Sequence, residues 1–276
     1  MKTFAKVMTA AIVITIGFAG WLNPIGNSAL ANPTTSVQAT QPLKDLTTDA
    51  DLSRWLSFYY LHPQPDLTLK ALNLVQKGNL AKTNVRNSLV AFFSQVMAQN
   101  PQRLAAWTEK FKAMDDNMKG MLWTALWQAN TSESNKQLAV LTKSLKPEQQ
   151  KLTLKMPAAT AIEKMTIDGP SVLDMLWAAY CATGDERYVK RVISVLTPPD
   201  THGAKKVSGS VASDMMRAGA AQWSLTSNAR LHKKVMAICI QERQATTNPA
   251  LKKELAAVIE KAQAVNKTPR KLSATK

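Results

Sequence analysis

The chain has 276 residues, of which 45% are hydrophobic and 20% charged, a composition that excludes a disordered tail and a polytopic membrane protein. Its 35 Lys and Arg residues against 19 Asp and Glu residues give a net charge of +16. With only two cysteines, it is neither a disulfide-dense scaffold nor a cysteine-rich zinc module.

The N-terminus has the parts of a secretory signal peptide, which we assign to residues 1–31. Lys2 and Lys6 form a basic start, residues 7–22 are apolar, and the Ala-Leu-Ala sequence at 29–31 is a small-residue cleavage pattern. The apolar stretch is shorter than the roughly 20 residues that span a bilayer. The alternative is an uncleaved N-terminal anchor. We expect an exported protein, periplasmic in a Gram-negative bacterium and otherwise secreted, whose net charge after cleavage is +14.

The next segment, residues 32–47, is rich in Thr, Gln, Ser, Ala and Pro and predicts a flexible leader. From residue 48 onward the apolar residues recur at helical spacing. Proline and glycine separate successive stripes, and the stripe at 121–127 is apolar nearly all round, which predicts a central, buried helix. The first six predicted helices carry their apolar residues at 52–60, 67–75, 85–97, 104–114, 121–127 and 138–145.

Residues 146–168 are less regular and predict a short helix and a connector, near which the helical domain (48–265) would divide if it were two. Helical spacing returns after Pro170, with stripes at 172–180 and 188–196 on either side of a Gly184-Asp185 turn. An exposed loop is predicted at 197–209 and a basic, disordered tail at 266–276. The three remaining helices are centred on 215–223, 231–239 and 251–259.

No stretch alternates as a strand would, so we predict an all-α protein of about 11–12 helices in antiparallel pairs that form an irregular α/α superhelix. Pairs such as Trp123–Leu138 and Trp177–Val192 share a loose plan of an aromatic-rich helix followed by one with Leu and Val pairs. This plan is similar to that of tetratricopeptide-type superhelices. The similarity concerns architecture alone, because the W-x2-L-G-x2-Y consensus is absent.

Several classes of functional site are missing from the sequence. His62, His202 and His232 stand apart without metal-ligand spacing, so we expect no metal and no cofactor. A nucleophile elbow, a P-loop and a dinucleotide fingerprint are also missing. No nucleic-acid recognition motif occurs, and we expect no nucleic-acid partner. The protein is therefore expected to bind rather than to catalyse.

The enzymatic alternative is a cell-envelope hydrolase of glycan or peptide whose acid is Glu133 or Asp174. The Glu133-Ser134 dipeptide resembles the catalytic Glu-Ser of muramidase-type transglycosylases, but the Gly-Leu-Met-Gln-type segment of that family is absent. A catalytic acid also needs an apolar pocket that raises its pKa. No such pocket is evident in the sequence around Glu133.

Charged and aromatic residues are densest at 168–191. One interpretation is a binding notch with aromatic walls and charged groups at its mouth. The other is an ordinary helix–turn–helix core, in which the aromatic side chains fill space and the aspartates start helices. The candidate binding residues are Asp174, Trp177, Tyr180, Arg187, Tyr188 and Arg191.

The two cysteines, Cys181 and Cys239, both lie within predicted helices beside apolar residues. In an oxidising compartment they could form one disulfide, which would remove roughly 4 kcal/mol of unfolded-chain entropy. Two separate buried thiols are the alternative.

The net charge has two interpretations as well. It could attract the protein to an anionic envelope surface, or it could only keep the chain soluble. We expect an exported scaffold that binds a protein, a peptide or an anionic envelope polymer, with no transmembrane span after signal cleavage. A further alternative is a toxin-neutralising or host-directed exported protein.

Overall fold

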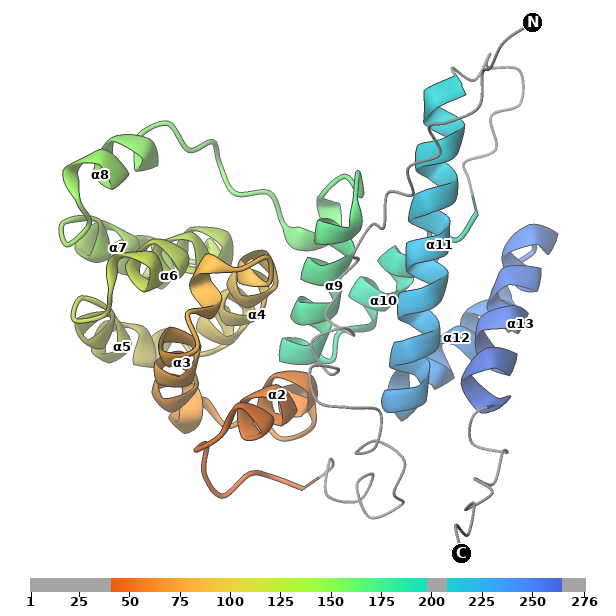
Figure 1. The fold of residues 1–276 in the computed structure, drawn as a ribbon, viewed down its shortest axis with the longest axis horizontal. Helices are drawn as coiled ribbons and strands as arrows, with labels where there is room; N and C mark the ends of the chain where they lie inside the picture. The colour runs from red at the N-terminus through yellow and green to blue at the C-terminus, as the bar shows by residue number, and fades with distance from the viewer. Residues whose placement is uncertain (1–40, 198–207, 265–276) are drawn as a thin grey trace, which may run out of the picture.

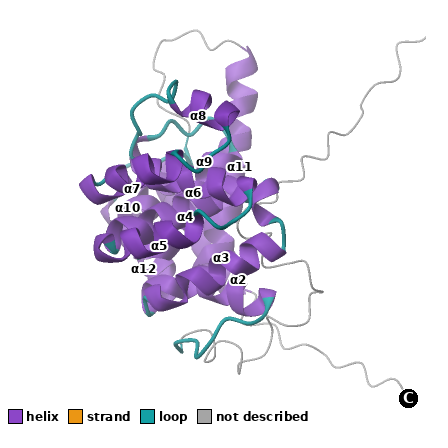
Figure 2. Cartoon of the chain, turned by 90° about the vertical axis from the view of Figure 1, so that its left-hand side faces the viewer, coloured by secondary structure: helices purple, strands orange, loops and turns teal. Residues whose placement is uncertain are grey.

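The structure is a computed structural model that describes residues 41–197 and 208–264, with the backbone alone for 208–212. The predicted signal peptide, the leader up to residue 40, nearly all of the predicted 197–209 loop and the basic tail lie outside the described residues. Within these residues the chain forms 12 α-helices and no strand (Figures 1 and 2). The all-α prediction is confirmed, and the number of helices is the predicted one.

The helices follow the predicted order closely. The first six are α2 (Asp49–Phe58), α3 (Thr68–Lys77), α4 (Arg86–Gln99), α5 (Leu104–Phe111), α6 (Asp116–Ala129) and α7 (Ser132–Thr142). The other six are α8 (Pro147–Thr153), α9 (Pro170–Thr183), α10 (Glu186–Ile193), α11 (Ser208–Leu231), α12 (Lys233–Ala245) and α13 (Pro249–Ala264). Short 3-10 turns precede or follow several of them: η2 (Tyr59–Leu61), η3 (Pro65–Leu67), η4 (Leu80–Lys82), η5 (Pro101–Arg103) and η6 (Ile162–Lys164). None of the described helices combines the length and apolar character needed to cross a bilayer.

Helices α4 and α9 lie side by side at the centre of the molecule, although about 70 residues separate them in sequence, and they form its most extensive helix–helix contact (Figure 1). Residues 88–94 of α4 and 176–182 of α9 are all buried. Since a helix turns once in 3.6 residues, each of these segments is covered on every side. The two helices therefore form the hydrophobic centre against which the others pack.

The remaining helices pack on the two sides of this pair. Helix α6 packs on α4 and is itself covered by α7, which also contacts α5. On the other side α10 packs on α9, and α11, α12 and α13 contact one another. Figure 1 shows α3 and α5 to α8 on one side of the α4–α9 pair and α10 to α13 on the other. Helix α6 is largely buried as its composition predicted, with Met121, Leu122 and Leu126 fully covered.

Aromatic rings attach α2 to this centre. Trp55 of α2 meets Phe92 of α4 at a ring distance of 5.3 Å, and Tyr59 meets Phe92 edge-on at 5.6 Å. Phe92 and Phe93 are themselves perpendicular, with centroids 5.4 Å apart. Edge-to-face pairs of this kind contribute about 1 kcal/mol beyond their burial. The first helix is thereby packed firmly on the central pair.

Residues 41–47, which the sequence predicts to belong to a flexible leader, are attached to the helical body. The Gln64 side chain binds both backbone groups of Leu43: its Oε1 accepts from the amide at 3.1 Å, and its Nε2 donates to the carbonyl at 2.6 Å. Arg54 donates to the Gln41 carbonyl at 2.8 Å, and Lys70 pairs with Asp45. Leu46 is buried in the core. Composition did not reveal these contacts because they come from side chains up to 25 residues away.

The predicted turn between α9 and α10 is present and depends on glycine. Gly184 ends α9 with φ at +68°, a left-handed conformation that disfavours other residues. A side-chain carbon built on Gly184 would lie 2.8 Å from Cδ2 of Tyr60. Asp185 then caps α10 by accepting from the Arg187 amide at 2.9 Å. This turn therefore has room for the Tyr60 ring only because residue 184 has no side chain.

A pair of Gly→Ala variants tests this dependence. Gly184→Ala should lower the free energy of unfolding by at least about 1 kcal/mol, because it adds a left-handed alanine and a clash with Tyr60. Gly219→Ala in α11 should raise it by about 0.5–1 kcal/mol, because an added carbon there meets nothing within 4 Å and alanine favours a helix. Urea denaturation measures both. A Gly184→Ala protein as stable as the wild type would contradict the packing described.

Candidate functional site

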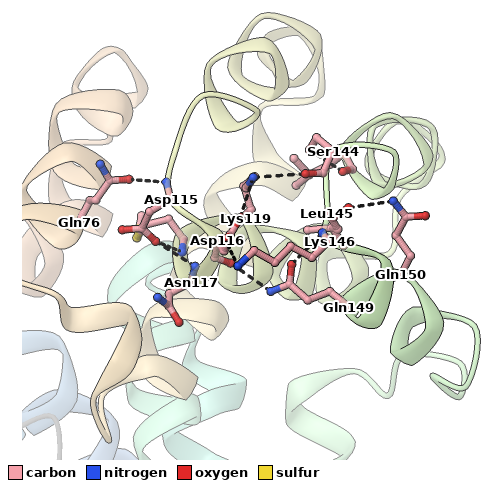
Figure 3. A network of polar contacts seen from close by, with 12 residues as sticks. Gln76, Asp115, Asp116, Asn117, Lys119, Ser144, Leu145, Lys146, Gln149 and Gln150 are labelled. Carbon is pink, nitrogen blue, oxygen red and sulfur yellow. Dashed lines mark hydrogen bonds and ion pairs between the residues drawn. The ribbon is translucent and has the colours of Figure 1, made fainter.

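Helix α8 is peripheral and is attached to α6 through polar contacts, shown in Figure 3. Its seven residues contain none that is fully buried. Lys146, just before the helix, pairs with Asp116 at 2.8 Å, and Gln149 Nε2 donates to the Asp116 carbonyl at 3.3 Å. Lys119 of α6 pairs with Asp116 at 2.9 Å and donates to the Ser144 carbonyl at 3.3 Å. These contacts fix the beginning of α8 on the beginning of α6.

Asp116 is the centre of this network. Hydrogen bonds from Lys146 and then from Lys119 lower the pKa of its carboxyl group, and the pair with Asp116 raises the pKa of Lys146. The carboxyl group of Asp116 and the ammonium group of Lys146 therefore both stay charged near neutral pH. The neighbouring Asp115 caps α6 by accepting from the amides of Asn117 and Met118, both at 2.9 Å.

Beyond this attachment, residues 151–156 expose apolar side chains to solvent. Leu152 is 65% exposed, Leu154 86% and Met156 39%. Isolated exposed apolar residues are common, but three within five positions form a local patch. Lys151 and Lys155 alternate with them and are exposed as well. We refer to residues 151–156 as the α8 tip.

A second group of exposed apolar residues belongs to α11. Met215, Met216 and Trp223 are 67%, 65% and 49% exposed. In Figure 1 α8 and the first part of α11 both lie in the upper part of the view, but on opposite sides of the α4–α9 pair. The charge nearest to the two methionines is neutralised, because Asp214 and Arg217 form an ion pair. The α8 tip therefore differs from this part of α11, because its lysines form no ion pair with a carboxylate of the described residues.

The structure places the aromatic residues of the predicted binding notch in the core. Trp177, Tyr180 and Tyr188 are at most 4% exposed. Trp177 and Tyr180 pack edge-to-face at 6.1 Å, and the Tyr188 hydroxyl donates to Gln95 Oε1 of α4 at 3.1 Å. Burial raises the pKa of Tyr188 to about 12. These rings fill space between helices, as in the packing interpretation, and they do not form the walls of an open notch.

The charged residues of the same segment take part in local contacts. Arg187 pairs with Asp185 at 2.6 Å, which lowers the pKa of that carboxyl group, and Arg191 donates to the Met165 carbonyl at 3.2 Å. Asp174 is partly buried in the second turn of α9, not at its start. Arg187 and Tyr188 follow the α9–α10 turn directly, while Asp174 lies in the opposite half of α9, and a binding role for these residues stays a prediction.

Cys181 and Cys239 are both free and buried. The structure therefore has two thiols in place of the candidate disulfide. Burial raises the pKa of each thiol to about 12. Neither cysteine is a nucleophile in this arrangement, because the thiolate is scarce and shielded from solvent.

The candidate hydrolase acid Glu133 lies in the first turn of α7. Gln137 Nε2 donates to its carboxylate at 2.8 Å and Lys136 pairs with it at 3.3 Å. Both contacts lower the pKa of Glu133. A general acid needs the opposite shift, so the surroundings of Glu133 do not favour the hydrolase alternative.

A buried polar contact that the sequence analysis did not foresee lies where α2, α9 and α12 meet. His232 is 2% exposed, and its Nδ1 lies 3.2 Å from the Tyr60 hydroxyl. The rings of Phe58, Tyr60 and Tyr180 surround it at centroid distances of 5.1–5.9 Å. Burial lowers the pKa of His232 to about 4, so the ring is neutral at pH 7. Spacing could not predict it, because its partners come from distant elements.

No group of three or more metal-ligating side chains occurs among the described residues. No protein-family model matches the chain, and neither a curated protein nor a solved structure with detectable similarity was found.

His232 predicts a specific pH dependence of stability. Its folded pKa lies below the usual unfolded value of 6.5, so its neutral form stabilises the fold above pH 6.5. Below this pH the unfolded chain binds a proton that the folded chain rejects, and stability falls by as much as about 3 kcal/mol as the pH reaches 4. Urea denaturation between pH 7.5 and 4.5 measures this loss.

The matched variant is His232→Asn, which cannot titrate. It should be less stable than the wild type at pH 7.5, since it loses the packing of the imidazole ring, but its stability should fall less between pH 6.5 and 4.5. The same pH dependence in both proteins would show that His232 does not carry the effect.

Proposed function

We propose that this chain is an exported, non-catalytic protein that docks on an anionic phospholipid surface through the α8 tip. One observation carries the proposal: Leu152 and Leu154 are 65% and 86% exposed, and Lys151 and Lys155 flank them. The N-terminal signal pattern supports an exported location, where envelope membranes are accessible.

The apolar side chains account for insertion. Transfer of an exposed leucine from water to an apolar environment is favourable by about 2 kcal/mol. Leu152, Leu154 and Met156 together supply enough free energy for reversible binding, but far less than a membrane-spanning helix would. Exposed apolar patches favour aggregation, so a patch that stays on the surface supports a role in binding.

The lysines account for the preference for a negatively charged membrane surface. Lys151 and Lys155 form no ion pair with a described carboxylate. Near an anionic bilayer each contributes about 1 kcal/mol. Long lysine side chains also keep their charge at the phosphate level while neighbouring leucines enter the acyl region. This combination favours an anionic bilayer over a neutral one and over a purely apolar partner.

The attachment of α8 supports docking as well. The Asp116 network fixes the start of the helix, and directly after the α8 tip Trp127 Nε1 of α6 donates to the Pro157 carbonyl at 3.1 Å, so the exposed side chains lie between two attachments. Insertion of the α8 tip would therefore require no rearrangement of the core.

A pair of leucine variants tests the apolar part. The exported chain should sediment with vesicles that contain phosphatidylglycerol, and Leu152→Ser with Leu154→Ser should weaken this binding at least about tenfold. The free energy of unfolding should change by less than about 0.5 kcal/mol, because both side chains are exposed.

The control is Leu61→Ser with Val140→Ser, which removes two less exposed apolar side chains elsewhere on the molecule. It should leave vesicle binding unchanged. If both double variants bind vesicles as well as the wild type does, or if the wild type does not bind them, docking through the α8 tip is wrong.

A pair of lysine variants tests the electrostatic part. Lys151→Gln with Lys155→Gln should weaken binding to anionic vesicles several-fold at about 50 mM salt, with a smaller effect at 300 mM, because exposed charges are screened. Lys252→Gln with Lys253→Gln on α13 makes the same change of net charge at another exposed site.

Comparison of the two lysine pairs separates local from overall charge. Binding should weaken more for the α8 tip pair than for the α13 pair. Equal weakening would mean that the protein binds through its net charge alone, which would contradict a role for the α8 tip.

A further inference from the structure

Arg86, at the first position of α4, is a partly buried cation without an acidic partner. Its guanidinium lies 3.4 Å from the Thr124 hydroxyl oxygen, and no carboxylate of the described residues forms an ion pair with it. Burial alone lowers the pKa of Arg86. By contrast, the side chain of Arg103 pairs with Asp66, and that of Arg217 pairs with Asp214.

The side chains of Arg86 and Gln149 both approach a glycine of α6. A side-chain carbon built on Gly120 would lie 3.9 Å from Arg86 Nη2 and 3.6 Å from Gln149 Nε2. A guanidinium from α4 and an amide from α8 therefore approach the same bare stretch of α6. Thr124 donates to the Gly120 carbonyl at 2.8 Å, which turns its oxygen lone pairs toward Arg86.

The donors that meet here suit an oxyanion. A guanidinium offers parallel N–H groups that match two oxygens of a phosphate, and it is less strongly hydrated than an ammonium. The Gln149 amide uses one hydrogen on the Asp116 carbonyl and retains a second. A partly desolvated cation with no counter-charge gains most from a bound anion.

We propose that Arg86, together with Gln149, binds a phosphate group, supplied in the docked state by a phospholipid headgroup. This inference rests on the proposed docking for the source of the phosphate, since the α8 tip begins two residues after Gln149. In the docked state the leucines enter the acyl region, and Arg86 meets the phosphate layer, which lies between the acyl region and the body of the protein. Arg86 thus gives the surface a preference for phosphate over other anions.

The experiment compares Arg86→Gln with Arg230→Gln, which makes the same charge change on α11, far along the chain and exposed. Two probes are used at constant ionic strength. Binding of inorganic phosphate is measured as the rise in melting temperature relative to chloride, and binding to phosphatidylglycerol vesicles is measured by sedimentation. In Arg86→Gln, phosphate should no longer raise the melting temperature more than chloride does, and vesicle binding should be about tenfold weaker. Arg230→Gln should match the wild type, and Arg86→Lys should fall between them, because it keeps the charge without the paired N–H groups.

A measurement on the wild type does not depend on how the variants fold. Phenylglyoxal modifies accessible arginines, and phosphate should protect the peptide that contains Arg86 by several-fold more than the peptide that contains Arg230. Equal protection of the two peptides, or an Arg86→Gln protein that equals Arg230→Gln with both probes, would overturn the inference.

The two proposals fail in distinguishable ways. Loss of vesicle binding in the leucine double variant, with the phosphate shift retained, is the result expected if both are correct. Vesicle binding that survives the leucine variant contradicts docking, while an Arg86-dependent phosphate shift in the same protein still supports a site for free phosphate. A phosphate shift that survives Arg86→Gln contradicts the site, whatever the vesicles show.

Discussion

The contact between α4 and α9 is the constraint on which the rest of the structure depends. Each helix has seven consecutive buried residues, so neither could form part of a stable surface helix without the other. The contact also joins residues 86–99 to residues 170–183, which makes the helices on either side parts of one hydrophobic core. A protein built only from neighbouring helix pairs would not need such a contact, since each pair would be covered by the next.

Most of the aromatic side chains of the described residues are buried in the core, so they are unavailable for contacts with a partner at the surface. Trp177, Tyr180 and Tyr188 are occupied by packing, and the two thiols are shielded. Helix α8 is built differently: it is attached by ion pairs and amide contacts around Asp116, and it contributes no fully buried residue. Because polar contacts hold the chain on both sides of residues 151–156, at Asp116 and at Pro157, the apolar side chains between them stay uncovered without an energetic conflict with the core.

Sequence patterns predicted the helices well because helical spacing of apolar residues records which face is buried. The Gly184 turn and the short helix after Pro147 were predicted for equally local reasons. Spacing does not record what a buried face packs against, so it could not reveal the α4–α9 contact, the attachment of residues 41–47 by Gln64, or the contact of His232 with Tyr60. For the same reason an aromatic stripe at 177–188 could be interpreted either as a notch or as core. The exposed α8 tip has a local sequence signal, because leucines and lysines lie close together at 151–155. It lies in a segment whose irregular pattern predicts a short helix and a connector and does not indicate a surface patch.

The net charge of +16 does not by itself distinguish a role in docking from a role in keeping the chain soluble. The ion pairs show which basic side chains are neutralised locally. Acids neutralise bases locally at Asp45, Asp66, Asp116 and Asp185, each of which pairs with a lysine or arginine. A charge that is paired in this way contributes little to the field at a distance, because the partner cancels it. Lys151, Lys155 and Arg86 lack such partners among the described residues, as do other bases such as Lys252 and Lys253, but they lie on or next to α8, where Leu152 and Leu154 are exposed. Unpaired positive charge and exposed apolar surface thus coincide at α8, and an anionic bilayer is a partner that satisfies both at once.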